Sequence, residues 1–182
     1  MGRQEQTNHL FSNRDLRILL VPLIVEQILN SLMGTADSIM VSNVGSAAIS
    51  AVSLVDSINI LVIQAFYALA AGGTIVCSQY IGQKDKKNAE ESARQLSFVV
   101  ACISSAVMAV CLLTRGPLLR LIFGSVEADV MEAAQIYFFY TALSFPFIAL
   151  YDAGSSIYRA QGNTRLPMTI AVVSNGLNIA GN

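Results

Sequence analysis

Four acidic residues lie inside long apolar stretches of the sequence: Glu26, Asp37, Asp56 and Asp152. A charged carboxylate near the centre of a bilayer costs at least about 2.5 to 3.5 kcal/mol, so a partner must offset that cost. A carboxyl group removed from water can take up and release a proton near neutral pH, or ionise when a cation arrives. Either behaviour suits a site that couples an ion to another process.

Glu26 and Asp37 are predicted to share one face of a helix. They are eleven residues apart, which at about 100° per residue gives three turns plus roughly 20° and a separation of about 16 Å. Asn30 falls close to the same face. Such a polar stripe must face other helices or a water-filled cavity, so Asp37 is a candidate for ion coupling, and Glu26 and Asn30 are candidate cavity residues. Carboxylates fixed by hydrogen bonds between helices are the alternative for both acids.

The other two acids are expected to play structural parts. Asp56 lies near the outer end of its apolar run, where an interfacial position is expected. Asp152 precedes Arg159 by seven residues, so the two lie on roughly the same face of one helix. We expect a structural polar contact there, near the cytoplasmic end.

Amide side chains form a second polar face late in the chain. Asn175, Asn178 and Asn182 are spaced three and four residues apart, which places them on one side of a helix. Amides can ligate a cation or hold helices together, and the spacing leaves both roles open.

The elements that carry these residues are predicted to be transmembrane helices. The chain has 182 residues, of which 54% are hydrophobic and only 13% charged, whereas about a quarter of an ordinary soluble domain is charged. Apolar runs long enough to cross a bilayer cover about 18–41, 51–81, 96–114 and 133–158, and a fifth run, 166–182, stops without a charged or aromatic end. The prediction is an all-α integral membrane protein with four complete transmembrane helices and a truncated fifth.

Prolines mark two expected irregularities. Pro22, near the start of the first span, is tolerable because neighbouring helices re-satisfy the freed backbone groups, and a bend is expected there. Residues 115–117 are predicted to end the third span. Residues 118–123 are then too short a run to cross the membrane again and are expected to lie at the interface.

The charged residues predict an orientation and exclude some partners. Alternating the sides of the spans puts nine of the 11 basic residues on one side, which the positive-inside rule makes the cytoplasm. Residues 1–15 are therefore predicted to form a cytoplasmic tail of a multi-pass plasma-membrane protein. With 11 basic against 12 acidic residues, the chain has no broad basic surface, so nucleic acid is not expected as a partner. Three cysteines without a CxxC pair indicate neither a disulfide framework nor a metal site.

Several segments, taken in order, resemble one family of transporters. They are PLIVEQILNSLMGTADSIMVSNVG, AVSLVDSINILVIQAFYALAAGGTIVCSQYIGQKD, YRAQGNTRLP and SNGLNIAGN. Together they look like the N-terminal lobe of MATE multidrug and toxic compound extrusion transporters, with residues 16–182 as the matching part. The resemblance implies a transporter of twelve helices in two six-helix lobes, of which this chain would form most of one.

The resemblance also implies a function and a set of site residues. Such antiporters export organic, often cationic compounds in exchange for H⁺ or Na⁺ and need no cofactor. The implied partners are the lipid bilayer, a small organic substrate and the missing C-terminal half. By position, Asp37 and Asn178 match cation-coupling residues of the family, which would hold Na⁺ if that is the ion. Asn182 stands where some members carry an aspartate, which leaves H⁺ and Na⁺ both open, and Pro22 matches a proline at which the first helix bends.

Two other functions are alternatives to export. A lipid-linked precursor flippase of the same superfamily is expected to line its cavity with more basic residues than these spans contain. A non-transporting membrane scaffold, alone or as a homo-oligomer, is a further alternative. An enzyme is not expected, because the single histidine, His9, lies in the tail and the sequence has no HExxH or GxGD motif.

Overall fold

The computed structural model describes residues 13–42, 45–124 and 126–181, without the side chains of residues 13, 15, 36–38, 40, 42, 179 and 181. Five helices and no strand occupy these ranges: α1 (Asn13–Ser42), α2 (Ser46–Gly82), α3 (Lys86–Phe123), α4 (Ala128–Ala160) and α5 (Arg165–Gly181). The all-α prediction is confirmed. Residues 1–12 of the predicted tail lie outside the described part.

Four helices are long and apolar enough to cross a membrane: Leu16–Thr35 within α1, and the whole of α2, α3 and α4. Large apolar side chains cover their outer surfaces, and Leu113 and Leu121 are each 85% exposed. A soluble protein rarely presents so much contiguous apolar surface, whereas a lipid-facing one requires it. α5 has 17 residues, so the four complete spans and the shorter fifth agree with the sequence prediction.

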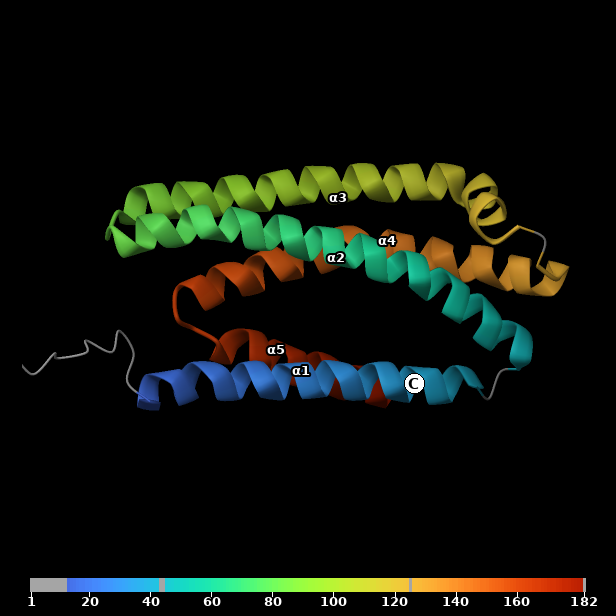
Figure 1. Ribbon diagram of the computed structural model, residues 1–182, viewed down its shortest axis with the longest axis horizontal. Helices are drawn as coiled ribbons and strands as arrows, with labels where there is room; N and C mark the ends of the chain where they lie inside the picture. Colours follow the sequence, from blue (N-terminus) through green and yellow to red (C-terminus); the bar gives the residue numbers. More distant parts are fainter. Residues whose placement is uncertain (1–12, 43–44, 125, 182) are drawn as a thin grey trace, which may run out of the picture.

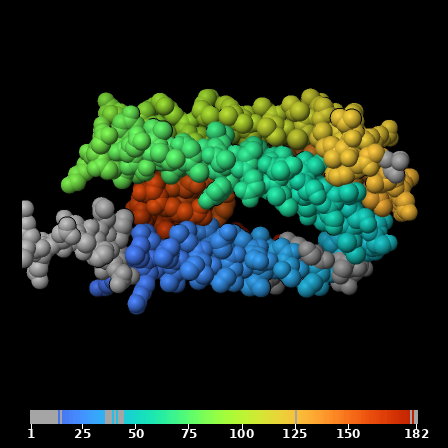
Figure 2. All heavy atoms as spheres, viewed as in Figure 1, coloured from blue at the N-terminus to red at the C-terminus, as the bar shows by residue number. Residues whose placement is uncertain are grey.

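The helices form two groups that are loosely joined. α2, α3 and α4 pack extensively against one another, whereas α1 packs mainly along α5 and touches α2 only briefly. In Figure 1, α1 and α5 run in the same direction side by side, apart from the other three helices. Figure 2 shows the open space that this arrangement leaves between α1, in blue, and α2, in teal.

Small side chains let α2, α3 and α4 approach closely. Ala70, Ala142 and Ala149 are fully buried in a core that also contains Phe66 and Phe145, whose rings meet edge to face at 5.9 Å. Membrane helices associate through such close packing because lipid tails are as apolar as the side chains themselves. We therefore expect the group of α2, α3 and α4 to be more rigid than the α1–α5 pair, which makes few contacts with it.

The predicted break in the third span is wrong. α3 continues without interruption through residues 115–117 and ends at Phe123, so Pro117 lies inside the helix. A proline removes one backbone hydrogen bond, a loss that membrane helices tolerate. The last turns of α3 swing away from its main axis (Figure 1), which accounts for the segment that the sequence presented as separate.

Candidate functional site

An ion pair joins α1 to α4 inside the protein. Arg159 Nη2 lies 2.6 Å from Glu26 Oε1, and the hydroxyl of Tyr151 donates a hydrogen bond of 3.3 Å to the same oxygen. Glu26 is only 3% exposed. A buried carboxylate needs such partners, because an unpaired charge in a medium of low polarity is costly. Glu26 is thus held by contacts between helices, one of the two roles expected for it.

These residues line a cavity of about 530 Å³ between α1, α2 and α4. That volume lies within the roughly 300 to 1,000 Å³ typical of small-molecule sites. The wall mixes apolar and aromatic side chains with two carboxyl groups, one guanidinium and three amides. The lining residues are Leu23, Glu26, Gln27 and Asn30 from α1, Ile63, Gln64 and Tyr67 from α2, and Tyr151, Asp152 and Arg159 from α4.

The cavity keeps unused hydrogen-bonding capacity. Glu26 Oε2, Asp152 Oδ2 and Arg159 Nε are buried atoms that have no hydrogen-bond partner within the described part of the chain. Most buried polar atoms in proteins are paired, so three orphans around one cavity indicate a place where a ligand or water binds. The predicted cavity residues Glu26 and Asn30 both lie in this wall.

The sequence patterns do not single out the polar lining residues Gln27, Gln64, Tyr67 and Tyr151. The sequence places Arg159 on the same helical face as Asp152 but does not predict its contact with Glu26. Its spacing from Asp152 was the available signal, because seven residues place both side chains on one face of α4. Asp152 and Arg159 both line the cavity. The polar contact expected near the end of α4 also includes the carboxylate of Glu26 from α1.

The predicted coupling residues lie on neighbouring helices, α1 and α5. Asp37 belongs to α1, but its side chain lies outside the described residues, as does the whole of Asn182. Asn178 is partly buried in α5. Thr164 contacts Ile18 near the starts of α5 and α1, which gives a common reference point. At a rise of about 1.5 Å per residue, Asp37 lies roughly 28 Å from that point along α1, and Asn178 lies roughly 21 Å from it along α5. Along the two adjacent helices, Asp37 therefore lies about 7 Å, a little more than one turn, beyond Asn178.

Two other polar residues singled out in the sequence make structural contacts. Asp56 Oδ1 accepts hydrogen bonds from Tyr137 of α4, at 3.1 Å, and from Asn59, at 3.3 Å. The amide of Asn175 is buried and donates to the carbonyl oxygen of Ala171 one turn earlier. The described residues contain no group of three or more histidine, cysteine, aspartate or glutamate side chains arranged to hold a metal ion.

Comparison with known proteins identifies the family. The sequence profile of the MatE family matches residues 22–182, which is most of the chain. The chain belongs to the MATE family of transporters.

This MATE-family chain is similar to several bacterial proteins. It is 33% identical over 178 residues to the uncharacterized transporter YisQ of Bacillus subtilis, covering 98% of this chain and 37% of that protein. It is 26% identical over 169 residues to NorM of Thermotoga maritima, a probable multidrug resistance protein, covering 91% of this chain and 35% of that one. The MATE-family chain thus spans little more than a third of the length of these relatives.

Solved MATE structures share the fold. A crystal structure of a MATE protein in the straight conformation superposes with a TM-score of 0.83, and one in the bent conformation with 0.79. Each is 23% identical in sequence; they cover 91% of this chain and 36% and 37% of their own chains. This likeness concerns the fold alone, and it places the five helices of the MATE-family chain in a known arrangement.

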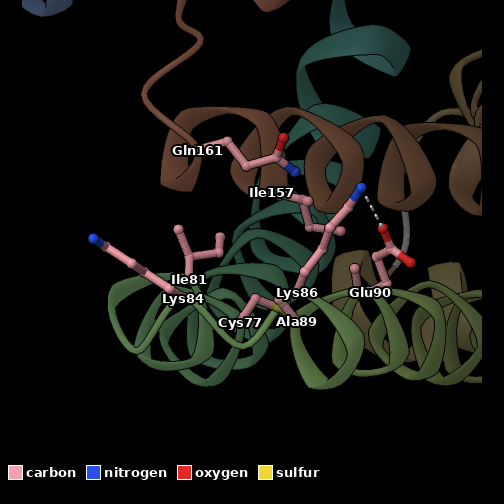
Figure 3. A pocket seen from close by; sticks show the side chains of 9 residues that line it. Cys77, Ile81, Lys84, Lys86, Ala89, Glu90, Ile157 and Gln161 are labelled. Carbon is pink, nitrogen blue, oxygen red and sulfur yellow. Dashed lines mark ion pairs between the residues drawn. The ribbon is translucent and has the colours of Figure 1, made fainter.

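A second cavity of the MATE-family chain, shown in Figure 3, is less suited to be its site. It has a volume of about 310 Å³ and lies where the ends of α2, α3 and α4 meet. Its one ion pair, Lys86 with Glu90 at 3.7 Å, is between two exposed side chains. Exposed ion pairs of this kind contribute little to stability or binding. This cavity is therefore less suited to recognise a ligand than the one lined by Glu26 and Arg159.

Proposed function

We propose that the chain is part of a secondary active exporter that moves organic, often cationic compounds outward in exchange for H⁺ or Na⁺ moving inward. One observation carries this proposal beyond family membership: a cavity of about 530 Å³ with two carboxyl groups opens between α1 and the α2–α4 group. Acidic groups beside aromatic and apolar side chains suit an amphipathic cation. The name of the Thermotoga maritima relative, a probable multidrug resistance protein, agrees with this substrate class.

Cation coupling is proposed at Asp37, assisted by Asn178 and Asn182. Asp37 lies in α1, which packs mainly on α5 and only slightly on the three-helix group. A cation bound there would change how α1 packs and weaken the contacts of α1 with substrate in the outward-open state. The energy comes from the ion gradient, and no cofactor is required.

The proposed orientation places the N-terminus in the cytoplasm. Its support is the excess of basic residues on that side, nine of 11. A membrane-impermeant amine reagent tests it on intact cells. Lys84, in the α2–α3 turn, should react only after the cells are opened, whereas labelling of Lys84 in intact cells would contradict the orientation.

The transport proposal is tested with the complete product of the gene that encodes these residues. It is expressed in bacteria that lack their own efflux pumps, and ethidium efflux from loaded cells is measured. Ethidium, an organic cation, should leave faster than from cells with an empty vector. A protonophore should stop this efflux if H⁺ is the coupling ion, and removal of external Na⁺ should stop it if Na⁺ is. Efflux equal to that of the empty vector, with the protein present in the membrane, would contradict the proposed function.

A further inference from the structure

The cavity between α1, α2 and α4 contains more acidic than basic groups. Glu26 and Asp152 contribute two carboxyl groups, and Arg159 contributes the one positive group among its described lining residues. The other titratable side chains in the wall are the phenols of Tyr67, from α2, and Tyr151, from α4. No described residue of α3 or α5 lines this cavity. With both carboxyl groups ionised, the cavity therefore holds one uncompensated negative charge.

Arg159 compensates only one of the two acids. Its guanidinium lies 2.6 Å from Glu26 Oε1. The second oxygen of Glu26 and Asp152 Oδ2 are both buried without a hydrogen-bond partner in the described structure, and the Glu26 side chain is only 4% exposed. Two carboxylates beside a single guanidinium leave one negative charge without a partner, which is costly in a buried site.

We propose that Glu26 and Asp152 together bind one monovalent cation, H⁺ or Na⁺, while Arg159 balances the remaining charge. The chemistry that both ions share is one positive charge on a buried carboxylate oxygen. A proton needs only that oxygen, whereas Na⁺ would also use the amide oxygens of Asn30 and Gln64 in the same wall. A divalent ion would leave an excess positive charge, so the site selects for monovalent cations.

This site is separate from the coupling residues of the proposed function. Glu26 precedes Asp37 by eleven residues in α1, a distance of about 16 Å along the helix. Binding at Glu26 and Asp152 does not depend on transport, and it is measured on the 182-residue chain itself. The inference uses the cavity that supports the export proposal, but the result of the binding test does not depend on whether export occurs.

Cation binding also has a structural consequence. Among the described residues, the pair of Glu26 with Arg159 is the one ion pair that joins two different helices. A cation shared by the two carboxylates reduces the negative charge that attracts Arg159 to Glu26. Occupancy therefore loosens the attachment of α1 to α4.

The experiment measures cation binding by the chain in lipid nanodiscs. One arm counts bound radioactive Na⁺ at fixed pH, and the other records the infrared carbonyl band of a protonated carboxyl group in Na⁺-free buffer. We expect one cation per chain in at least one arm. The substitution Asp152→Asn removes the excess charge and should reduce this signal at least tenfold. The control Asp129→Asn alters an exposed acid of the same helix and should leave the signal unchanged.

The outcomes separate the two ions and can overturn the proposal. A carboxyl band without Na⁺ binding identifies the proton, and stoichiometric Na⁺ binding that Asp152→Asn abolishes identifies Na⁺. No signal in either arm for the unaltered chain overturns the proposal, and so does a signal that persists in Asp152→Asn. Circular dichroism checks that the variant is folded. If Asp152→Asn does not fold, Glu26→Gln takes its place with the same criterion.

Discussion

The hydroxyl of Thr164, just before α5, donates a hydrogen bond of 3.4 Å to the carbonyl oxygen of Ile18 in α1. In an unbroken helix that carbonyl would accept from the backbone N–H of residue 22, but Pro22 has no N–H. The start of α5 therefore satisfies the group that the proline frees. This contact fixes the two helices at one end and explains how Pro22 is tolerated inside α1.

The first prediction concerns this contact. Thr164 is only 3% exposed, so Thr164→Val leaves a buried acceptor without its donor and should lower the free energy of unfolding by about 1 to 3 kcal/mol. Thr164→Ser keeps the hydroxyl and should cost less. Thermal unfolding of the purified chain in detergent measures both variants.

A double-mutant cycle makes the test specific. Pro22→Ala restores the backbone N–H that can bond to Ile18, so Thr164→Val should cost less in the Pro22→Ala background than in the original chain. Equal costs in the two backgrounds would show that Thr164 does not compensate for the proline.

The second prediction concerns the buried ion pair. Glu26 is 4% and Arg159 26% exposed at the side chain, so Arg159→Met strands a buried carboxylate and should destabilise the chain by about 3 to 5 kcal/mol. Adding Glu26→Gln should recover much of that loss, because the unpaired charge is then gone. Denaturant titration in mixed micelles compares both variants with the unaltered chain. A double variant as unstable as Arg159→Met alone would mean that lost packing, not charge, sets the cost.

The third prediction uses two adjacent glycines of α2. A Cβ at Gly73 would overlap the side chain of Leu96 in α3, whereas a Cβ at Gly72 meets nothing within 4 Å. Gly73→Val should therefore destabilise the chain by about 1 to 3 kcal/mol relative to Gly72→Val. Both variants carry the same side chain in the same helix, so the comparison isolates the contact. Melting temperatures that agree within error would rule out close packing at Gly73.

Hydropathy alone predicted the five helices, because a bilayer demands long apolar runs whatever the fold. It failed at Pro117, where charge, glycine and proline within three residues mimic the end of a span although the backbone continues as helix. Hydropathy does not show whether neighbouring groups can replace the backbone hydrogen bond that a proline removes, so it cannot predict whether a helix continues through that proline.

The candidate site was predictable only in part. Periodicity placed Glu26 and Asn30 on one inward face, and both line the cavity. The partner of Glu26 could not be predicted, because Arg159 is 133 residues away in the chain and the pairing depends on how α1 and α4 approach each other. The role of Asp37 stays a prediction, since its side chain lies outside the described residues.

Asp37 is the residue proposed to couple a cation to export. The direct measurement is ethidium efflux, driven by an imposed ion gradient, from cells that express the complete gene product with Asp37→Asn. Asp129→Asn, which alters an exposed acid at the start of α4, serves as the control. We predict that Asp37→Asn slows efflux by about tenfold or more, an increase of at least about 1.4 kcal/mol in activation free energy, while the control matches the unaltered protein. Undiminished gradient-driven efflux by Asp37→Asn, at equal amounts in the membrane, would contradict the coupling role of Asp37.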